Sequence, residues 1–263
     1  MLGSSGTWTF DGSSWTSFPV AQGPAERDGT AMAVLGNQVV QYGGSFGFGP
    51  NTISSQTWGF NGATWMQRSD GPGARNDHAM AALNGRVVVF GGYDGTKLLG
   101  DTETFDGANW VSFGLGPSAR SSTAMAALGG RIVLFGGGGA SGKLGDTWTF
   151  DGATWTQQNI PGPPARYGHA MATLNGEVVL FGGVPALGDT WTFNGASWTQ
   201  RNISGPPGRA GHAMATLNGQ VVLFGGYGGP NKNDTWAFDG TKWTQKNVVG
   251  PPAMSGHAMA TLR

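Results

Sequence analysis

Short apolar runs alternate with small and polar residues along the chain, and the same order of runs returns many times. In one copy, residues 169–174 alternate in character, Asn175-Gly176 follows, and the apolar residues 177–181 stop at Gly182-Gly183. Residues 189–193 then alternate threonine with aromatic side chains before a second Asn-Gly pair. Such short runs are typical of β-strands, and Asn-Gly is a strong hairpin signal. The pattern predicts four antiparallel strands in each copy.

The copies fill the chain at a nearly constant spacing. The third predicted strand of each copy carries an aromatic position, occupied in chain order by Trp8, Trp58, Glu103, Trp148, Trp191 and Trp236. The steps between these positions are 50, 45, 45, 43 and 45 residues, and the units begin at about residues 24, 72, 117, 163, 206 and 251. A four-stranded sheet of this length cannot bury both faces alone, so neighbouring sheets must pack around an axis. We expect one domain, residues 1–263, folded as an all-β, six-bladed propeller of four-stranded antiparallel blades.

The sixth unit is incomplete. Five units carry the apolar second strand that ends in Gly-Gly, whereas the sixth stops after residues 257–263 and resumes at residues 7–10. We therefore expect a sixth blade that is shared between the two termini and lacks one strand. Its unpaired backbone groups need partners, so we expect either a truncated natural sequence or a strand that another molecule or residues 1–6 supply. Unless another chain supplies that strand, we expect a monomer.

The repeated residues resemble the kelch family. The shared features are the Gly-Gly pair after the second strand, a later aromatic residue, and a tryptophan on the outer hairpin. Phe150 departs from the tyrosine that is usual in the motif. The resemblance implies protein-recognition scaffolds, substrate receptors, sialic acid mutarotases, iron-dependent specifier proteins or galactose oxidase. Resemblance to galactose oxidase implies a tyrosine crosslinked to cysteine, and that activity is excluded because the chain has no cysteine. The iron-dependent specifier proteins carry a Glu, Asp and His iron motif, which we do not find in this sequence.

Composition narrows the classes of partner. Glycine accounts for 49 residues, charged residues for 11%, and the formal net charge is zero. The scattered charges form no basic stripe, so neither nucleic acid nor an anionic membrane is expected as a partner. We find no secretory signal at the first residues and no apolar run near the roughly 20 residues of a membrane helix. The sequence predicts a soluble protein and leaves its compartment open.

All four histidines occupy one register, at the start of the first strand of a unit. This register holds His78, His169, His212 and His257, with threonine in two other units. Equivalent positions around an axis converge if their side chains point inward, so three imidazoles could hold zinc, iron or manganese. Such a metal would activate water for hydrolysis of an ester, lactone or phosphotriester. The alternative is that each histidine bonds a neighbouring loop carbonyl, and the period-two pattern does not decide between the two.

Arginines recur three residues before that register, and loop aromatics differ between units. The recurring arginines are Arg27, Arg75, Arg120, Arg166 and Arg209. They present forked donors for an anionic ligand, although Asp101, Asp146, Asp189 and Asp234 at another repeated register would suit inter-blade ion pairs. The tryptophans fit an inter-blade core better than a sugar site. The loop residues available for sugar or peptide contacts are Tyr167, Phe46, Phe48, Tyr93 and Tyr227.

Three functions remain open from the sequence. The first is a propeller that binds a ligand or protein, with a peptide, glycan or small anion held on the long-loop face around the axial channel. The second is the histidine-dependent metallohydrolase described above, whose catalytic residues are unknown. The third is a designed or consensus-like repeat scaffold with no evolved ligand, because close similarity between units also follows from copying alone.

Overall fold

The computed structural model describes residues 6–18, 23–47, 49 and 52–262. These residues form five four-stranded antiparallel sheets and one two-stranded sheet. The two-stranded sheet pairs β1 (Thr7–Phe10) with β2 (Trp15–Phe18). The first two four-stranded sheets contain β3 (Ala31–Leu35), β4 (Gln38–Tyr42), β5 (Thr57–Phe60) and β6 (Trp65–Gln67), then β7 (Ala79–Leu83), β8 (Arg86–Phe90), β9 (Asp101–Phe105) and β10 (Trp110–Leu115). The next sheet contains β11 (Ala124–Leu128), β12 (Arg131–Gly139), β13 (Gly142–Phe150) and β14 (Trp155–Gln158). The last two contain β15 (Ala170–Leu174), β16 (Glu177–Phe181), β17 (Thr190–Phe193) and β18 (Trp198–Arg201), then β19 (Ala213–Leu217), β20 (Gln220–Phe224), β21 (Thr235–Phe238) and β22 (Trp243–Lys246).

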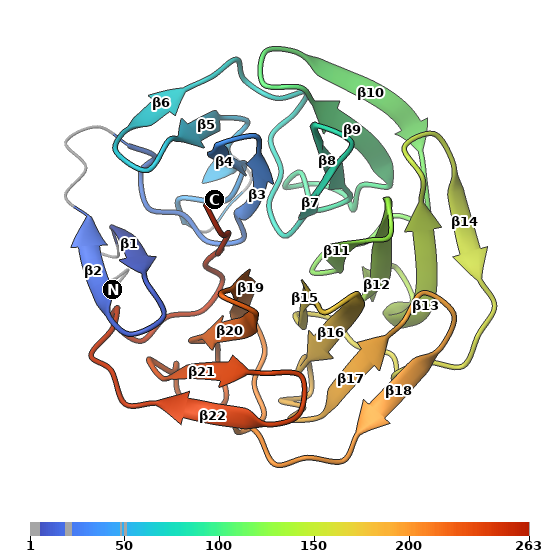
Figure 1. Cartoon of the computed structure of the whole chain (residues 1–263). Helices are drawn as coiled ribbons and strands as arrows, with labels where there is room; N and C mark the ends of the chain where they lie inside the picture. Colours follow the sequence, from blue (N-terminus) through green and yellow to red (C-terminus); the bar gives the residue numbers. More distant parts are fainter. Residues whose placement is uncertain (1–5, 19–22, 48, 50–51, 263) are drawn as a thin grey trace.

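The sheets stand as blades around one axis (Figure 1). In each complete blade the first strand lies nearest the centre and the fourth lies at the rim, as the labels β19 to β22 show in Figure 1. The β1–β2 hairpin occupies the space between the blade that ends in β22 and the blade that contains β6. The C-terminal segment passes on the inner side of this hairpin. The fold is therefore an all-β propeller with five complete blades and a partial one.

The two hairpins of a blade use different turns. Between β15 and β16, Leu174 pairs with Glu177, so Asn175 and Gly176 form a two-residue turn at positive φ, as the sequence predicted. Between β17 and β18 the loop has four residues rather than two. The Asn194 side-chain oxygen accepts hydrogen bonds from the backbone N–H groups of Ala196 and Ser197, each at 2.9 Å. This Asx turn replaces the tighter hairpin expected there, and Asp or Asn closes the equivalent loop in the other outer hairpins.

The hydrophobic core lies between blades rather than inside one. Val179 and Phe181 of one blade pack with Val221 and Leu223 of the next, and Trp243 completes the same cluster. Five of the six rim tryptophans also donate the indole N–H to a threonine hydroxyl of the preceding blade, at 2.8 to 3.0 Å, whereas the Trp110 indole nitrogen has no hydrogen-bond partner among the described residues. The five pairs, donor first, are Trp15 with Thr235, Trp65 with Thr7, Trp155 with Thr102, Trp198 with Thr147, and Trp243 with Thr190. The β1–β2 hairpin therefore bonds to both of its neighbours in the way that complete blades bond to each other.

The up-and-down order of the strands separates two faces of the propeller. The turns from first to second strand and from third to fourth strand lie on one face. The opposite face collects the segments from second to third strand, including the tight β12–β13 turn at residues 140–141, and those from fourth strand to the next blade. We call this second surface the loop face. It also carries the start of every first strand, where the histidines and arginines recur. Within the described ranges, the chain contains no helix that is long and apolar enough to cross a membrane.

Candidate functional site

A closed ring of backbone hydrogen bonds surrounds the propeller axis at the loop face. One residue from each repeat donates its N–H to the carbonyl of the ring residue before it, at 2.7 to 2.9 Å, and all six have φ between 51° and 73°. The ring residues are Gly29, Asp77, Ser122, Gly168, Gly211 and Gly256. A positive φ turns the peptide groups so that they point along the ring, and glycine adopts this φ at little cost. We call the axial cavity of about 150 Å³ beside this ring the channel mouth.

The Gly-Gly pair joins each complete blade to the following repeat. In all five pairs the second glycine donates its N–H to a carbonyl of the next repeat, at 2.8 to 2.9 Å. The acceptors are the carbonyls of Arg75, Arg120, Arg166, Arg209 and Met254. The first glycine has no room for a side chain, because a Cβ at Gly182 would stand 2.6 Å from the Arg209 carbonyl oxygen and 2.8 Å from His212. Glycine is therefore required at this contact by space as well as by its φ of 72°.

Each histidine fills the interface with the preceding blade. The imidazoles of His78, His169, His212 and His257 lie edge-on to an aromatic ring of that blade, with centroids 5.2 to 5.6 Å apart. Burial lowers the pKa of three of them to about 3 and that of His257 to about 4. Among the described residues, no ring nitrogen makes a hydrogen bond of good geometry. The imidazoles are thus buried, neutral packing groups at physiological pH.

The histidines line one cavity but do not form a metal-binding group among the described residues. Each imidazole belongs to a different blade interface, although all four residues contribute to the wall of the channel mouth. No group of three or more His, Cys, Asp or Glu side chains lies close enough to hold a metal in the parts of the chain that the structure describes. The described residues therefore offer zinc, iron or manganese no group of three such ligands.

Four of the five recurring arginines are paired with aspartate and completely covered. Arg166, for example, is 0% exposed and binds both Asp189 carboxylate oxygens through two nitrogens, at 2.7 and 2.8 Å. Arg75, Arg120 and Arg209 make the same two-pronged contact with Asp101, Asp146 and Asp234. Both partners belong to one repeat, so the ion pairs lie within blades and not between them. A ligand at the surface has no access to these four guanidinium groups.

The aspartates are held ionised by several donors. Burial by itself would raise the pKa of Asp189, but hydrogen bonds from Arg166 and from the Trp191 indole outweigh it, so that the pKa is lowered. The same balance lowers the pKa of Asp146 and Asp234, each of which also accepts an indole N–H. Blade-internal pairing therefore fixes the start of the third strand against the start of the first.

Arg27 is the exception among the arginines. Its repeat has Gln56 where the others have aspartate, and the Arg27 guanidinium donates to the Gln56 amide oxygen at 2.9 Å and to Ser54 at 3.1 Å. Burial lowers the pKa of Arg27 to about 10. The guanidinium carbon lies 4.6 Å from the centre of the Phe46 ring, a cation–π contact. Arg27 is half-buried and forms no ion pair within the described ranges, so a ligand on the loop face could reach it.

The non-repeating aromatics lie on the loop face, and three of them are exposed. Phe46 is 40% exposed, Tyr93 37% and Tyr227 58%. Tyr93 and Tyr227 follow Gly-Gly pairs and form β-bridges to Asn76 and Ala210, the residues that precede the inner strands. Tyr167 is half-buried beside ring residue Gly168, and Phe48 lies outside the described residues.

One carboxylate, Asp77, lines the channel mouth, and a second, Asp28, precedes the ring residue Gly29. Burial and the nearby Asp28 raise the pKa of Asp77, and burial together with Glu26 raises the pKa of Asp28. Neither carboxylate makes a salt bridge among the described residues. The uncompensated charge beside the axis is therefore negative, opposite in sign to the arginine ring that the sequence suggested.

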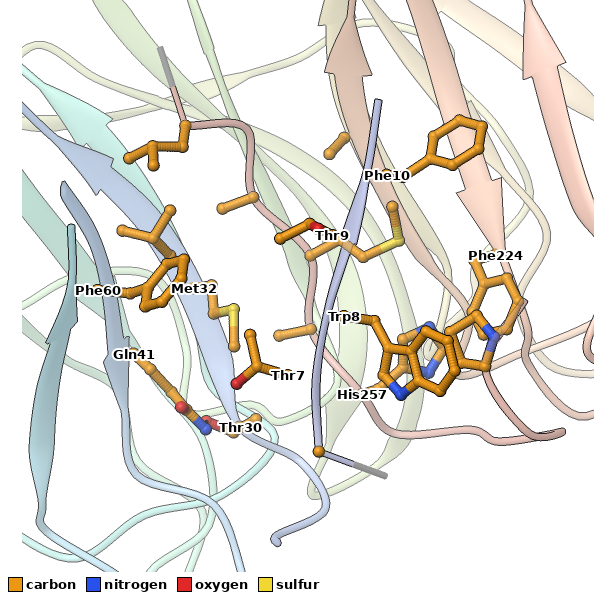
Figure 2. A pocket seen from close by; sticks show the side chains of 18 of the residues that line it. Thr7, Trp8, Thr9, Phe10, Thr30, Met32, Gln41, Phe60, Phe224 and His257 are labelled. Carbon is orange, nitrogen blue, oxygen red and sulfur yellow. Dashed lines mark hydrogen bonds between the residues drawn. The ribbon is translucent and has the colours of Figure 1, made fainter. Parts of the chain in front are cut away.

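A larger cavity opens at the partial blade. It measures about 410 Å³ and lies between β1, residues 257–262 and the two neighbouring blades. Figure 2 shows Thr7 directed toward Thr30 and Gln41, while Trp8 lies on the other side of the strand, toward Phe224. Met32 and Phe60 form the wall on the Thr7 side. We call this cavity the terminal groove.

Comparison with known families agrees with the repeated residues. The KLHDC2/KLHL20/DRC7 Kelch-repeats domain matches residues 66–194 and, in a second overlapping match, residues 153–263. The chain belongs to this kelch-repeat family. The two matches together span more than half of the kelch domain described above and include four of its five complete blades. No curated protein matches the chain.

The ring residues and the two carboxylates of the kelch domain escaped the sequence analysis. A glycine two residues after arginine recurs in three repeats, and Gly256 follows Met254 in the same way, which was the available signal for the ring. Asp77 and Ser122 interrupt this glycine pattern, and the sequence does not suggest that they share the glycine conformation, because non-glycine residues seldom adopt positive φ. Asp28 and Asp77 lie next to each other only through the ring bond between the Asp77 N–H and the Gly29 carbonyl, which no sequence spacing reveals.

Proposed function

We propose that this kelch domain binds a peptide or protein partner on its loop face, around the channel mouth. The observation that carries the proposal is the set of exposed aromatics Phe46, Tyr93 and Tyr227 on the same face as the axial carboxylates. Tyrosine and phenylalanine supply large contact areas at low entropic cost, and they are enriched in binding surfaces. Loops on a rigid scaffold are also where binding residues concentrate.

Charge indicates the chemistry of the partner. Four arginines are unavailable because they bind aspartate. Asp77 lines the channel mouth and Asp28 lies next to ring residue Gly29, while Arg27 packs on Phe46 on the same face. A lysine or arginine of the partner would offset these carboxylates, and an acidic or anionic ligand would be repelled. We therefore favour a basic peptide segment over the glycan or small anion that the arginine ring suggested.

The test is selection from a library of random displayed peptides on the immobilised protein. Peptides selected by the unchanged protein should be rich in Lys or Arg and in apolar residues. Their affinity should fall at least about tenfold for the Tyr93→Ala, Tyr227→Ala variant and for the Asp28→Asn, Asp77→Asn variant, which is about 1.4 kcal/mol of binding. Phe113→Ala is the matched control, since Phe113 is 43% exposed on the rim strand β10, away from the loop face.

The outcomes of this selection distinguish the three candidate functions. Peptides that bind all variants equally well would contradict binding on the loop face. Failure to select any peptide would favour a repeat scaffold with no evolved ligand. The metal-dependent hydrolase has no supporting observation among the described residues, because they form no ligand group around the axis.

We further propose that residues 1–263 form one domain whose repeats make a six-membered ring, with an incomplete sixth blade shared between the termini. The support comes from the six ring residues, one per repeat, and from the Trp15–Thr235 and Trp65–Thr7 bonds on either side of the β1–β2 hairpin. Residues 257–262 take the place of the first strand, and β1 and β2 take those of the third and fourth. The strand between them is absent from the described residues.

A further inference from the structure

We infer that the propeller opens between its first two complete blades, and that Glu103 closes this contact when its carboxyl group takes up a proton. The two blades contain β3 to β6 and β7 to β10, and they stand side by side in Figure 1. We call their contact the first interface. The inference concerns contacts inside the propeller, so it does not depend on any ligand on the loop face.

The first interface lacks the rim hydrogen bond of the others. At five interfaces a rim tryptophan donates to a threonine of the preceding blade. The equivalent pair here is Trp110 and Thr57, and among the described residues neither the Trp110 Nε1 nor the Thr57 Oγ1 has a partner, although both atoms are buried. The Trp110 ring lies 4.6 Å from the Tyr42 ring, whereas the corresponding centroids are 5.1 to 5.4 Å apart at four interfaces that have phenylalanine instead of tyrosine. Buried polar groups without partners weaken the contact to which they belong.

Tyr42 also occupies an acceptor that an arginine uses in other blades. At the equivalent arginines of three blades, Nε donates to the carbonyl two residues earlier, at 2.9 to 3.0 Å. For Arg75 that carbonyl belongs to Gly73, and it accepts the Tyr42 hydroxyl. The Arg75 Nε is consequently buried without a partner in the described part of the chain. A third polar group at the first interface is therefore unpaired.

Glu103 stands at this interface in place of a tryptophan. It pairs with Val89, which packs with Tyr42 and Ala33 of the preceding blade, so Glu103 faces the first interface. The residue is 4% exposed, and its Oε2 has no hydrogen-bond partner among the residues that the structure describes. An ionised carboxylate only accepts hydrogen bonds, so this oxygen needs a donor that the first interface does not supply.

The tryptophan that Glu103 replaces has a second role in three other blades. There its indole N–H donates to the aspartate two residues earlier, as Trp191 does to Asp189 at 2.7 Å, and the same aspartate binds the arginine. In the blade of β7 to β10, Arg75 is the one side chain within the described ranges that donates to Asp101. A carboxylic acid has one O–H, so Glu103 replaces the missing indole as a donor only when it is protonated. Protonation also removes one of two neighbouring negative charges.

The charged groups around Glu103 favour the protonated form. Burial and the negative charge of Asp101 raise the pKa of Glu103, and the positive charge of Arg75 opposes them. Tyr42 stays neutral, because burial raises the pKa of its hydroxyl. β5, β7 and β10 contain no titratable residue, and in β8 only Arg86 is titratable, at the far end of the strand. The stabilisation by the proton is therefore complete below the unfolded pKa of about 4.3 and is lost as the pH rises through the higher folded pKa.

The loop-face end of the first interface carries three further titratable groups. Asp28 and Asp77 lie beside the ring bond that joins the two blades, and burial raises the pKa of both, so their protonation acts in the same direction as that of Glu103. His78 packs on Tyr42 and acts in the opposite direction, because burial lowers its pKa. Variants of Glu103 compared at one pH keep these three contributions constant.

The experiment measures amide hydrogen exchange of the full chain at about pH 7.5, where an opened interface loses its protection. The Gly44 and Asp77 N–H groups cross the first interface at 2.9 and 2.7 Å, and those of Gly137 and Gly168 make the same two bonds, both at 2.8 Å, between the blades that start with β11 and β15. In the unchanged protein the first pair of amides should be at least about tenfold less protected than the second. Glu103→Gln has a donor at every pH and should raise the protection of the first pair by about fivefold or more, without changing the second.

Two further variants and one titration complete the test. Tyr42→Phe, Glu103→Trp restores the residue types of the other interfaces and should bring the first pair of amides to the protection of the second. Glu177→Gln is the matched control, since Glu177 begins β16 in a different blade, and it should change neither pair. The chain has three glutamates, so NMR of carboxyl-labelled glutamate gives three signals, and the one that Glu103→Gln lacks belongs to Glu103. In the folded protein this signal should titrate at a higher pH than in the urea-unfolded chain.

Three results would overturn the inference. Equal protection of the two pairs in the unchanged protein would mean that the propeller does not open preferentially at the first interface. Protection that Glu103→Gln leaves unchanged at the first pair, or raises equally in both pairs, would mean that Glu103 does not act on this contact. A Glu103 signal that titrates no higher in the folded than in the unfolded protein would mean that the folded chain does not hold the proton more tightly.

Discussion

Replacing His169 by threonine should make the protein less sensitive to acid. The His169 pKa is about 3 in the folded chain because the imidazole is buried, against about 6.5 in an unfolded chain. The unfolded chain therefore takes up a proton below about pH 6.5 that the folded chain refuses, and the free energy of unfolding falls as the pH drops from about 6.5 toward about 3.

The size of this effect at pH 5 depends almost entirely on the unfolded state. The interval from about pH 6.5 to about pH 5 corresponds to about 2 kcal/mol for one histidine, whether its folded pKa is 3 or 4. Four such histidines together remove about 8 kcal/mol, which is comparable with the whole stability of a domain, about 5 to 15 kcal/mol. We expect the unchanged protein to be close to unfolding at about pH 5.

The threonine variant tests one histidine without leaving a polar group unpaired. Thr123 occupies the same register and donates to the Phe135 carbonyl at 2.8 Å, and a threonine at position 169 has the Phe181 carbonyl in the same relation. Urea unfolding followed by tryptophan fluorescence measures the free energy at about pH 7.5 and about pH 5, and the loss between them should shrink by about 2 kcal/mol in His169→Thr. Asp189, with its lowered pKa, loses its stabilising effect only at lower pH, because it must be protonated first.

Two results would refute this reasoning. One is an identical pH dependence of the unfolding free energy in both proteins. The other is an imidazole NMR signal of His169 that titrates near pH 6.5 in the folded protein, about its ordinary value.

Three further predictions test the blade contacts. Gly182→Ala should lower the unfolding free energy by several kcal/mol more than Gly176→Ala, because both glycines have φ above 70° but only Gly182 has backbone atoms within 3 Å of a new Cβ; urea unfolding of the two variants measures the difference, and equal losses would contradict it. Arg166→Lys should cost about 3 kcal/mol or more, since a lysine cannot make the two-pronged contact inside a buried pair, whereas Arg27→Lys should cost less than about 1 kcal/mol. Trp155→Phe should lower the unfolding free energy by about 1 kcal/mol by removing one hydrogen bond between blades, seen as a lower melting temperature, and an unchanged value would mean that the bond contributes nothing.

Strand order and the core were readable from the sequence because they depend on local patterns. The Asn175-Gly176 turn, the apolar run ending at Gly182-Gly183 and the tryptophan registers each predict one element, and the structure has that element. For the outer hairpin the sequence predicted a two-residue turn, but Asn194 closes a four-residue loop through its side chain. Asn-Gly alone does not distinguish these two turns.

The site was less predictable, because it depends on which neighbour a side chain faces. A blade has another blade on each side, so alternation could not tell whether His169 points to the axis or to Phe135. For Arg166 the sequence suggested an ion pair with an aspartate of a neighbouring blade, whereas the structure pairs it with Asp189 of its own blade. Asp189 lies two strands away in the same sheet, about 9.6 Å across, and the long arginine side chain spans that distance.

The closed ring at the axis has an electrostatic consequence. Each N–H and C=O in the ring points along its circumference, and the six bonds follow one another in the same rotational sense. Peptide dipoles arranged head to tail in a circle cancel, whereas those in a helix add and give its ends partial charges. The six ring peptide groups therefore contribute no net dipole along the axis, so the charge that an approaching partner meets there comes chiefly from nearby side chains, among them Asp28 and Asp77.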